Sequence, residues 1–289
     1  MTATAPAPAP VPAPTKKKKP SRERDPRPWT QRVREGYAWI TISTIAILIL
    51  LWEIIPQIGI INRILFPTFT DTMAGFAQLV AGGYWWEDLA KTMYAVAIAW
   101  VIGCTFGFVM GVVLGTNPFI RQAITPYAIA VQALPKVVLA PLLIGWLGFG
   151  SESKIALAVI ICFFPVWIDT MVGLALPAAN EFKLMQSLKA SRWQIFTKLQ
   201  LPSAIPLIMV GVKHSLLLAF TGVLVAEILS ASDGGLGKLA KEFASQLNMS
   251  LTYAVVLVVV ILAVVLVSIA DVIERRVVFW SEENRARKR

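Results

Sequence analysis

The chain has 289 residues, of which 56% are hydrophobic and only 15% are charged, and its mean hydropathy is +0.67. A soluble domain carries about 25% charged residues, so this composition is typical of a membrane protein. The formal net charge of +10 is compatible with nucleic-acid binding, but the basic residues gather at the two ends and in one internal loop, between long apolar runs. We therefore expect a membrane protein without a nucleic-acid partner.

The first 36 residues are predicted to form a disordered basic tail. Residues 3–14 consist mainly of Ala and Pro, and nine Lys or Arg precede residue 37, a composition typical of an extended chain. The apolar run 37–55 has about the length that spans a bilayer, and no small-residue cleavage site follows it. We interpret this run as an uncleaved signal anchor.

Six apolar runs are long enough to cross a membrane as helices. They are about 37–55, 90–115, 122–147, 154–175, 204–229 and 252–273. Between the first two, residues 71–80 have the apolar spacing of a short amphipathic helix. Pro126, Pro135 and Pro141 interrupt the third run and predict a bent helix. The predicted fold class is all-α, a polytopic membrane bundle at 37–280 between the tails 1–36 and 281–289.

The basic residues predict the orientation of these spans. With six spans, twenty Lys or Arg lie on one side: nine before residue 37, Arg121, four in 176–200 and six from Arg275 onward. Four lie on the other side. Because cytoplasmic loops carry the excess of Lys and Arg, both termini are predicted in the cytoplasm. The expected location is a bacterial inner membrane, in contact with its lipid.

Residues that build metal or catalytic centres are scarce. Cys104 and Cys162 lie inside apolar runs, and His214 is the sole histidine, so no typical metal spacing occurs. The Walker pattern GxxxxGK[ST] is absent, because Gly237-Lys238 is followed by Leu239. We expect no catalytic residue, metal or cofactor in this chain, and energy from ATP would have to come through another chain.

Four glycines, Gly103, Gly107, Gly111 and Gly115, recur every four residues on one face of the second span. Small residues at this spacing let helices pack closely. Packing within the chain and packing against a second subunit both remain open.

The loop 177–202, on the basic side, combines apolar and basic residues in two short stretches separated by Ala190-Ser191. Its apolar side chains are Phe182, Met185, Leu188, Trp193, Ile195 and Phe196, and its basic ones are Lys183, Lys189, Arg192 and Lys198. A short helix that projects from a membrane bundle can insert into a groove on a partner, or it can lie flat on anionic lipid. Periodicity alone leaves both alternatives open.

This loop resembles the cytoplasmic coupling loop of binding-protein-dependent ABC importer permeases. The family pattern is roughly Glu-Ala-Ala, three residues, Gly, and then nine residues to Ile-x-Leu-Pro. The matching residues here are Lys183-Leu184-Met185, Lys189 and Leu199-Gln200-Leu201-Pro202. Lys183 and Lys189 thus replace the Glu and the Gly of the pattern.

Further ordered matches cover about residues 64 to 280. They include Leu65-Phe66-Pro67, Leu134-Pro135-Lys136, Phe164-Pro165, Ala226-Glu227 and Gly234-Gly235-Leu236-Gly237. These matches are similar to the nitrate, sulfonate and taurine permease group, and the Leu-Pro-Lys form resembles its branch for pyrimidine thiamin precursors.

The resemblance implies a type I ABC importer permease that pairs with a second copy and binds a separate ATP-binding cassette ATPase. A periplasmic or lipid-anchored substrate-binding protein would deliver a small polar or anionic solute, such as a sulfonate, taurine, nitrate or a pyrimidine precursor. The residues expected to couple the chain to the ATPase are Leu184, Met185, Leu188, Lys189, Ala190, Ser191, Arg192 and Phe196.

Two charged residues within the spans are candidates for the translocation pathway, because polar groups at membrane depth are costly and are commonly functional. Lys136 can meet an anionic group of the solute, or its side chain can extend along the bundle. Glu227 can pair with a lysine, shape an outer gate or pack in a helix–loop corner. The sequence leaves these alternatives open.

Two other classes of function compete with an ATP-driven importer. An ion-coupled secondary transporter would need carboxylate or histidine relays within the spans, and few are present. An intramembrane serine protease would need a serine beside His214, but the adjacent Ser215 points elsewhere on a helix. Vanadate-sensitive transport that resists a protonophore would favour the importer.

Overall fold

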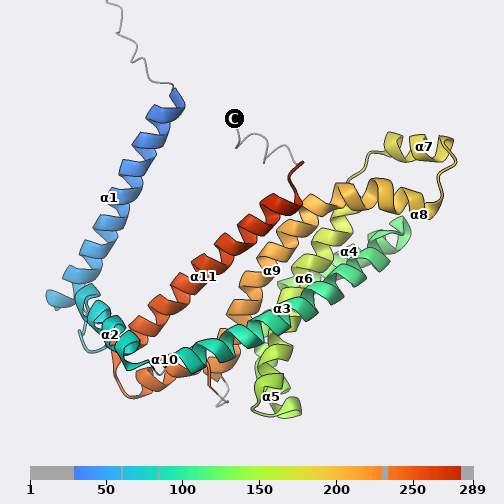
Figure 1. Cartoon of the computed structure of the whole chain (residues 1–289). Helices are drawn as coiled ribbons and strands as arrows, with labels where there is room; N and C mark the ends of the chain where they lie inside the picture. Colours follow the sequence, from blue (N-terminus) through green and yellow to red (C-terminus); the bar gives the residue numbers. More distant parts are fainter. Residues whose placement is uncertain (1–28, 60, 84, 230–233, 281–289) are drawn as a thin grey trace, which may run out of the picture. The chain divides into compact units, whose positions relative to one another are not determined.

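The computed structural model describes residues 29–59, 61–83, 85–229 and 234–280, with side chains from residue 39 onward. The tails predicted at 1–28 and 281–289 lie outside the described residues. The described residues form helices and no strand (Figure 1), which confirms the all-α fold class. Five of these helices are long and apolar enough to cross a membrane, and one bent pair of helices would make a sixth span.

Two compact units divide the chain between Leu51 and Trp52. Of the first unit, the structure describes the part of α1 (Trp29–Gln57) that precedes Trp52. α1 begins at Trp29 rather than near residue 37, so the helix includes residues 29–36 of the predicted tail. The apolar stretch Trp39–Gln57 has the length of a membrane span.

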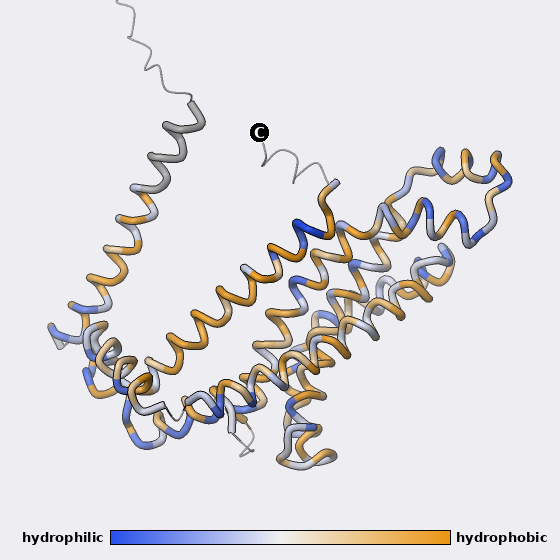
Figure 2. Tube along the Cα trace, in the orientation of Figure 1, coloured by the Kyte–Doolittle hydropathy of each residue, from blue (hydrophilic) through white to orange (hydrophobic). Residues whose placement is uncertain are grey.

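The second unit is a bundle built around α3 (Trp85–Gly115), α6 (Ser151–Gly173) and α9 (Leu201–Leu229). α6 packs against both α3 and α9, and small buried residues such as Ala99, Ala158 and Ala219 fill the core between them. α11 (Met249–Val277) packs against α9, α10 (Leu236–Ser245) and α2 (Phe69–Gly82). Hydrophobic residues dominate these long helices, and hydrophilic ones gather at their ends and connections (Figure 2).

The repeated glycines of α3 face α6. A Cβ atom built on Gly107 would lie 2.7 Å from the carbonyl oxygen of Phe163, and one on Gly111 would lie 2.5 Å from Cβ of Thr170. Side chains cannot approach so closely, so the two helices can touch only because these positions are glycine. The glycine face therefore packs within the chain, which is one of the two alternatives that the sequence left open.

The third predicted span consists of two helices that are bent by 76°. α4 (Pro118–Ala133) ends before Leu134-Pro135, and η1 (Lys136–Leu139) and α5 (Ala140–Leu147) follow. Proline lacks the N–H that a helix needs and disfavours helical geometry in the residue before it, and Leu134 is extended, with ψ 137°. The predicted bend is confirmed, and Pro135 is its cause. Pro126 lies inside α4, and Pro141 occupies the first turn of α5.

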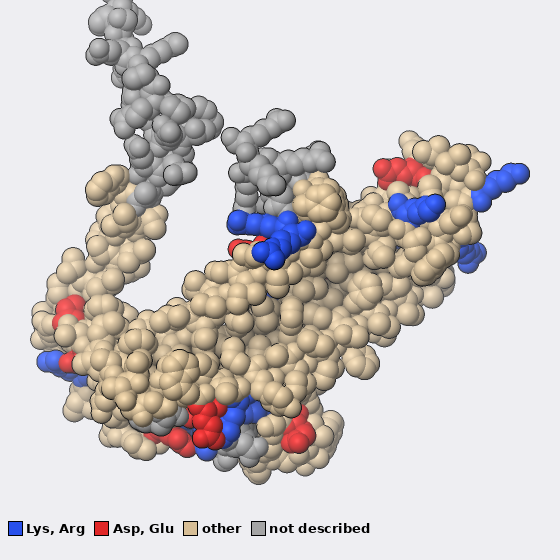
Figure 3. Space-filling model, viewed as in Figure 1, with Lys and Arg blue, Asp and Glu red and all other residues tan. Residues whose placement is uncertain are grey.

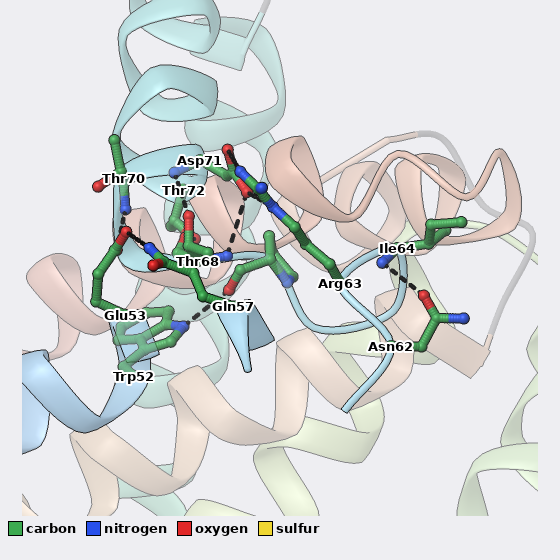
Figure 4. A network of polar contacts seen from close by, with 11 residues as sticks. Trp52, Glu53, Gln57, Asn62, Arg63, Ile64, Thr68, Thr70, Asp71 and Thr72 are labelled. Carbon is green, nitrogen blue, oxygen red and sulfur yellow. Dashed lines mark hydrogen bonds and ion pairs between the residues drawn. The ribbon is translucent and has the colours of Figure 1, made fainter. Parts of the chain in front are cut away.

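A polar network fixes the start of α2 (Figure 4). The hydroxyl of Thr68 accepts the N–H of Asp71 at 3.0 Å, and the Asp71 carboxylate accepts the N–H of Thr68, which forms a capping box. Arg63 donates two hydrogen bonds to that carboxylate, at 2.9 and 3.0 Å. Chiefly through these bonds, Arg63 holds the pKa of Asp71 below its ordinary value. The network also contains the Trp52 indole, which donates to the Pro67 carbonyl at 3.0 Å.

Candidate functional site

The loop predicted to couple the chain to an ATPase forms a corner between two short helices at one end of the bundle (Figure 1). α7 (Ala179–Ser187) and α8 (Arg192–Ile195) are joined through Leu188, Lys189, Ala190 and Ser191. Ser191 caps α8: its hydroxyl accepts the N–H of Gln194 at 3.2 Å, while its own N–H donates to the Gln194 side chain at 2.8 Å. The predicted corner at Ala190-Ser191 is confirmed.

Lys189 adopts the left-handed backbone conformation, with φ 53°. This conformation costs an L-amino acid about 1–2 kcal/mol, and glycine adopts it readily. The family pattern that this loop resembles has glycine at this position, and the left-handed turn is present here although the side chain is lysine. The turn reverses the chain between α7 and α8.

Apolar side chains project from the corner into solvent. The side chains of Leu184, Leu188 and Trp193 are 61%, 68% and 70% exposed. Trp193 was counted among the apolar side chains of the loop but not among the expected coupling residues. Met185 and Ala190 are half-buried, and Lys189 and Arg192 are exposed. The loop therefore presents a small apolar surface with basic residues around it.

Phe196 belongs to the base of the loop rather than to its tip. It is half-buried and packs against the core cluster of Leu174, Ala204 and Ile208. Its ring centroid lies 5.7 Å from that of Trp193. Phe196 can therefore transmit a displacement of α8 to the span.

A π-helical turn, η2 (Phe196–Gln200), joins α8 to α9, and the N–H of Leu201 donates to the carbonyl of Phe196. The chain is helical without interruption from Arg192 to Leu229, so the predicted span 204–229 begins earlier than expected. Such turns occur frequently at functional sites.

Glu227 lies at the centre of a fully buried polar cluster. The side chains of Lys154 and Glu227 are 1% and 0% exposed, and Lys154 Nζ lies 3.5 Å from Glu227 Oε1. The hydroxyl of Thr92 donates to the same carboxylate at 3.0 Å. α3, α6 and α9 each supply one of these three residues. Of the alternatives left open for Glu227, the structure shows the pair with a lysine. This lysine, Lys154, is the first residue of the predicted span 154–175 and had been counted among the four basic residues on the side opposite the cytoplasm.

The glycine-rich segment 234–237, which leads into α10, closes over this cluster. The N–H of Gly237 donates to the Glu227 carboxylate at 3.0 Å, and Lys154 donates to the Gly234 carbonyl at 3.2 Å. The N–H of Gly235 donates to Asp88 at 2.7 Å. A Cβ atom on Gly235 would collide with the Glu227 carboxyl group. Gly235 and Gly237 are thus required because their backbone packs so closely around Glu227 that no Cβ atom fits.

Lys136 has a different environment. Its ammonium group donates to the Gln132 carbonyl at 2.8 Å and lies 4.7 Å from the ring centroid of Phe164. Within the described part of the chain, no carboxylate lies within ion-pair distance of Lys136. Lys136 therefore keeps the capacity to meet an anion, whereas Lys154 is neutralised by Glu227.

A second ion pair, which the sequence analysis missed, joins α9 to α11. Lys213 Nζ lies 2.7 Å from Asp271 and 3.0 Å from Glu274. The two acidic residues are three positions apart, so they share one helix face. That spacing could have predicted an acidic face on this helix, but nothing in the sequence indicates which lysine pairs with it.

Charged side chains on the face shown in Figure 3 gather towards the ends of the helices.

Comparison with known families identifies most of this bundle. A family model for the "binding-protein-dependent transport system inner membrane component" matches residues 103–279. The matched part includes the α7–α8 corner, the bent span, and Lys154 and Glu227 of the buried cluster, whereas Thr92 lies before it.

Curated relatives cover nearly the whole bundle. A Bacillus subtilis (strain 168) protein named as a permease for aliphatic sulfonates transport is 28% identical, and the alignment covers 86% of this chain and 90% of the relative. The taurine transport system permease protein of Escherichia coli (strain K12) is 26% identical, with 84% and 90% covered. A formylaminopyrimidine transport permease protein of Halalkalibacterium halodurans is 28% identical, with 55% and 64% covered.

Solved structures share the fold. A chain of the inward-facing MetNI methionine ABC transporter superposes with a TM-score of 0.53 at 20% identity, covering 67% of this chain and 94% of that chain. A chain of a bacterial ABC transporter that imports alginate superposes with a TM-score of 0.57 at 15% identity, covering 86% and 99%. The fold is that of type I importer membrane subunits.

Proposed function

Because this chain belongs to the family of binding-protein-dependent transport system inner membrane components, we propose that the corner between α7 and α8 docks it on the ATPase that drives transport. The chain is the membrane-spanning permease subunit of an ATP-driven importer. Its family works with a separate ATPase subunit and with a substrate-binding protein.

The observation that carries the docking proposal is the exposure of Leu184, Leu188 and Trp193 at the tip of the corner. Exposed apolar groups rimmed by polar residues mark interaction sites, and a short helix that carries such groups fits a groove on a partner. Because α8 continues through η2 into α9, a push on the corner would be passed directly to a membrane span.

Leu188→Asp tests this proposal. The change places a charge where an apolar contact is expected, so the ATPase should no longer copurify, and transport should be lost. The matched control is Ile64→Asp, which introduces the same charge at an exposed position outside the loop and should leave copurification intact. Wild-type transport in Leu188→Asp would contradict the proposal.

We further propose that both termini face the cytoplasm and that two copies of the chain form the pathway within membrane lipid. The excess of twenty basic residues against four supports this orientation. It predicts that a cysteine at Ser187 reacts with a membrane-impermeant reagent only in inside-out vesicles, and a cysteine at Ile64 only in intact spheroplasts. The opposite labelling pattern would reverse the orientation.

For the solute we propose a small polar or anionic compound of the kind named for the relatives, a sulfonate, taurine or a pyrimidine precursor, with nitrate as a further candidate. The surroundings of Lys136 support a solute with an anionic group, because the lysine charge has no carboxylate partner among the described residues. Glu227 would shape the pathway indirectly, by holding the glycine-rich segment. Identifying the solute that copurifies with the partner binding protein tests the substrate class, and Lys136→Gln should weaken transport of an anion more than Lys241→Gln does.

A further inference from the structure

A groove of about 900 Å³ lies beside the α7–α8 corner. One wall comes from the end of α3 and the start of α4, and includes Val112, Val113 and Ile120. The other wall comes from α8 and η2, and includes Trp193 and Phe196. The groove thus separates the proposed docking segment from two other helices of the bundle.

Two arginines, Arg121 and Arg192, are the charged residues that line this groove. Within the described part of the chain, neither has a carboxylate at ion-pair distance. Arg121 makes one long hydrogen bond, 3.4 Å from its Nη1 to the Gly115 carbonyl, so most of its donors remain available. A guanidinium group binds phosphate through paired hydrogen bonds. The groove therefore fits an anion that carries a phosphate group.

The apolar wall limits the kind of anion. Val112 and Val113 belong to the last turns of a helix that is long and apolar enough to span the membrane, which ends at Gly115. Arg121 follows in the first turns of α4. The groove therefore joins an apolar wall at the end of this helix to the arginine side chains, and a small soluble anion would leave that wall unfilled. An amphipathic anion fills both parts.

We propose that this groove binds an anionic phospholipid, with its phosphate at Arg121 and Arg192 and an acyl chain along Val112 and Val113. The inference rests on the proposed orientation, in which the groove opens towards the anionic cytoplasmic leaflet. Because α8 and η2 form one wall, a bound lipid would support the segment that docks on the ATPase. Lipid and ATPase binding would then strengthen each other.

Native mass spectrometry of the purified importer complex in mixed phosphatidylglycerol and phosphatidylcholine tests this proposal. The wild-type complex should retain phosphatidylglycerol. Arg121→Gln should lower the apparent affinity about tenfold, which is the range for one lost charge-assisted contact. Arg121→Lys keeps the charge and should recover part of the affinity. Lys183→Gln removes a nearby exposed charge that does not line the groove and should have no effect.

Several results would overturn the proposal. Equal retention of the two lipids would show that the charge of the lipid plays no part in binding. If Lys183→Gln lost as much affinity for phosphatidylglycerol as Arg121→Gln, the lipid would be attracted only by the basic charge of the loop in general. Competition by soluble glycerol phosphate as strong as competition by the full lipid would mean that the apolar wall is irrelevant. Lipid retention is measured independently of ATP hydrolysis. The lipid proposal can therefore be tested even if the Leu188→Asp experiment contradicts docking on the ATPase.

Discussion

Lys154 and Glu227 form an ion pair that is completely enclosed by α3, α6, α9 and the glycine-rich segment before α10. Taking two charges out of water is costly, and hydrogen bonds to the carboxylate from Thr92 and Gly237 offset part of that cost. The pair therefore ties α6, α9 and the glycine-rich segment to one point.

Removing one partner of this pair should be strongly destabilising. Glu227→Gln or Lys154→Met leaves a buried charge without compensation, and each should lower the unfolding free energy by about 3–5 kcal/mol. The double variant should recover much of this loss, because no isolated charge remains. Glu242→Gln is the matched control, since its pair with Lys238 is exposed and should contribute less than about 1 kcal/mol. Thermal unfolding in detergent measures these effects, and additive losses in the double variant would contradict the coupling.

Gly235→Ala should displace the glycine-rich segment. Its Cβ would collide with the Glu227 carboxyl group, and its φ of 123° is poorly accessible to alanine. Backbone strain of this kind costs about 1–3 kcal/mol. Gly145→Ala serves as the control, because a Cβ there meets no atom within 4 Å. If both variants unfold at the same temperature, the close contact at Gly235 is not required.

Lys189 should be replaceable by glycine but not by valine. Glycine adopts the left-handed turn without strain, whereas a β-branched residue resists it. We expect Lys189→Val to be about 1–2 kcal/mol less stable than Lys189→Gly and to lose coupling between ATP hydrolysis and transport. Lys189→Gly should stay coupled, because the geometry of the corner is preserved. Loss of coupling in both variants would instead indicate that the lysine charge itself contacts the ATPase.

The network at α2 should weaken in acid. Arg63 lowers the pKa of Asp71 in the folded chain, below the value of about 3.9 that an unfolded aspartate has. The stabilisation is therefore present above about pH 4 and is lost as the pH falls through the lowered pKa. The stability difference between wild type and Asp71→Asn should be constant from pH 7 to 5 and should shrink below about pH 4. A difference that disappears above pH 5 would rule out this pair as the cause.

Local signals were sufficient to predict most of the fold. The apolar runs gave the long helices because spanning a bilayer needs a minimum length, and the bend followed from Pro135, whose ring excludes a continuous helix. The corner at Ala190-Ser191 was likewise predicted, and the structure adds the capping box between Ser191 and Gln194 that fixes it.

The buried cluster could not be predicted in the same way. Lys154 and Glu227 are 73 positions apart, and a lysine at the edge of an apolar run looks like a loop residue. Only the packing of α6 against α9 brings the two charges together. The start of α1 was also misjudged, because charged residues among 29–36 concealed a helix that continues into the apolar run.

The π-turn Phe196–Gln200 accommodates one extra residue at the junction between α8 and α9. A π-turn holds one residue more than an α-helical path of the same course, and each residue of an α-helix turns the chain by about 100°. Deleting Thr197 should therefore restore a regular helix and leave α7 and α8 on nearly the same course. Deleting a residue in the regular part of α9 should instead rotate them by about that angle around the helix axis. The junction between Ile195 and Leu201 can thus lose one residue without changing the direction of the proposed docking corner.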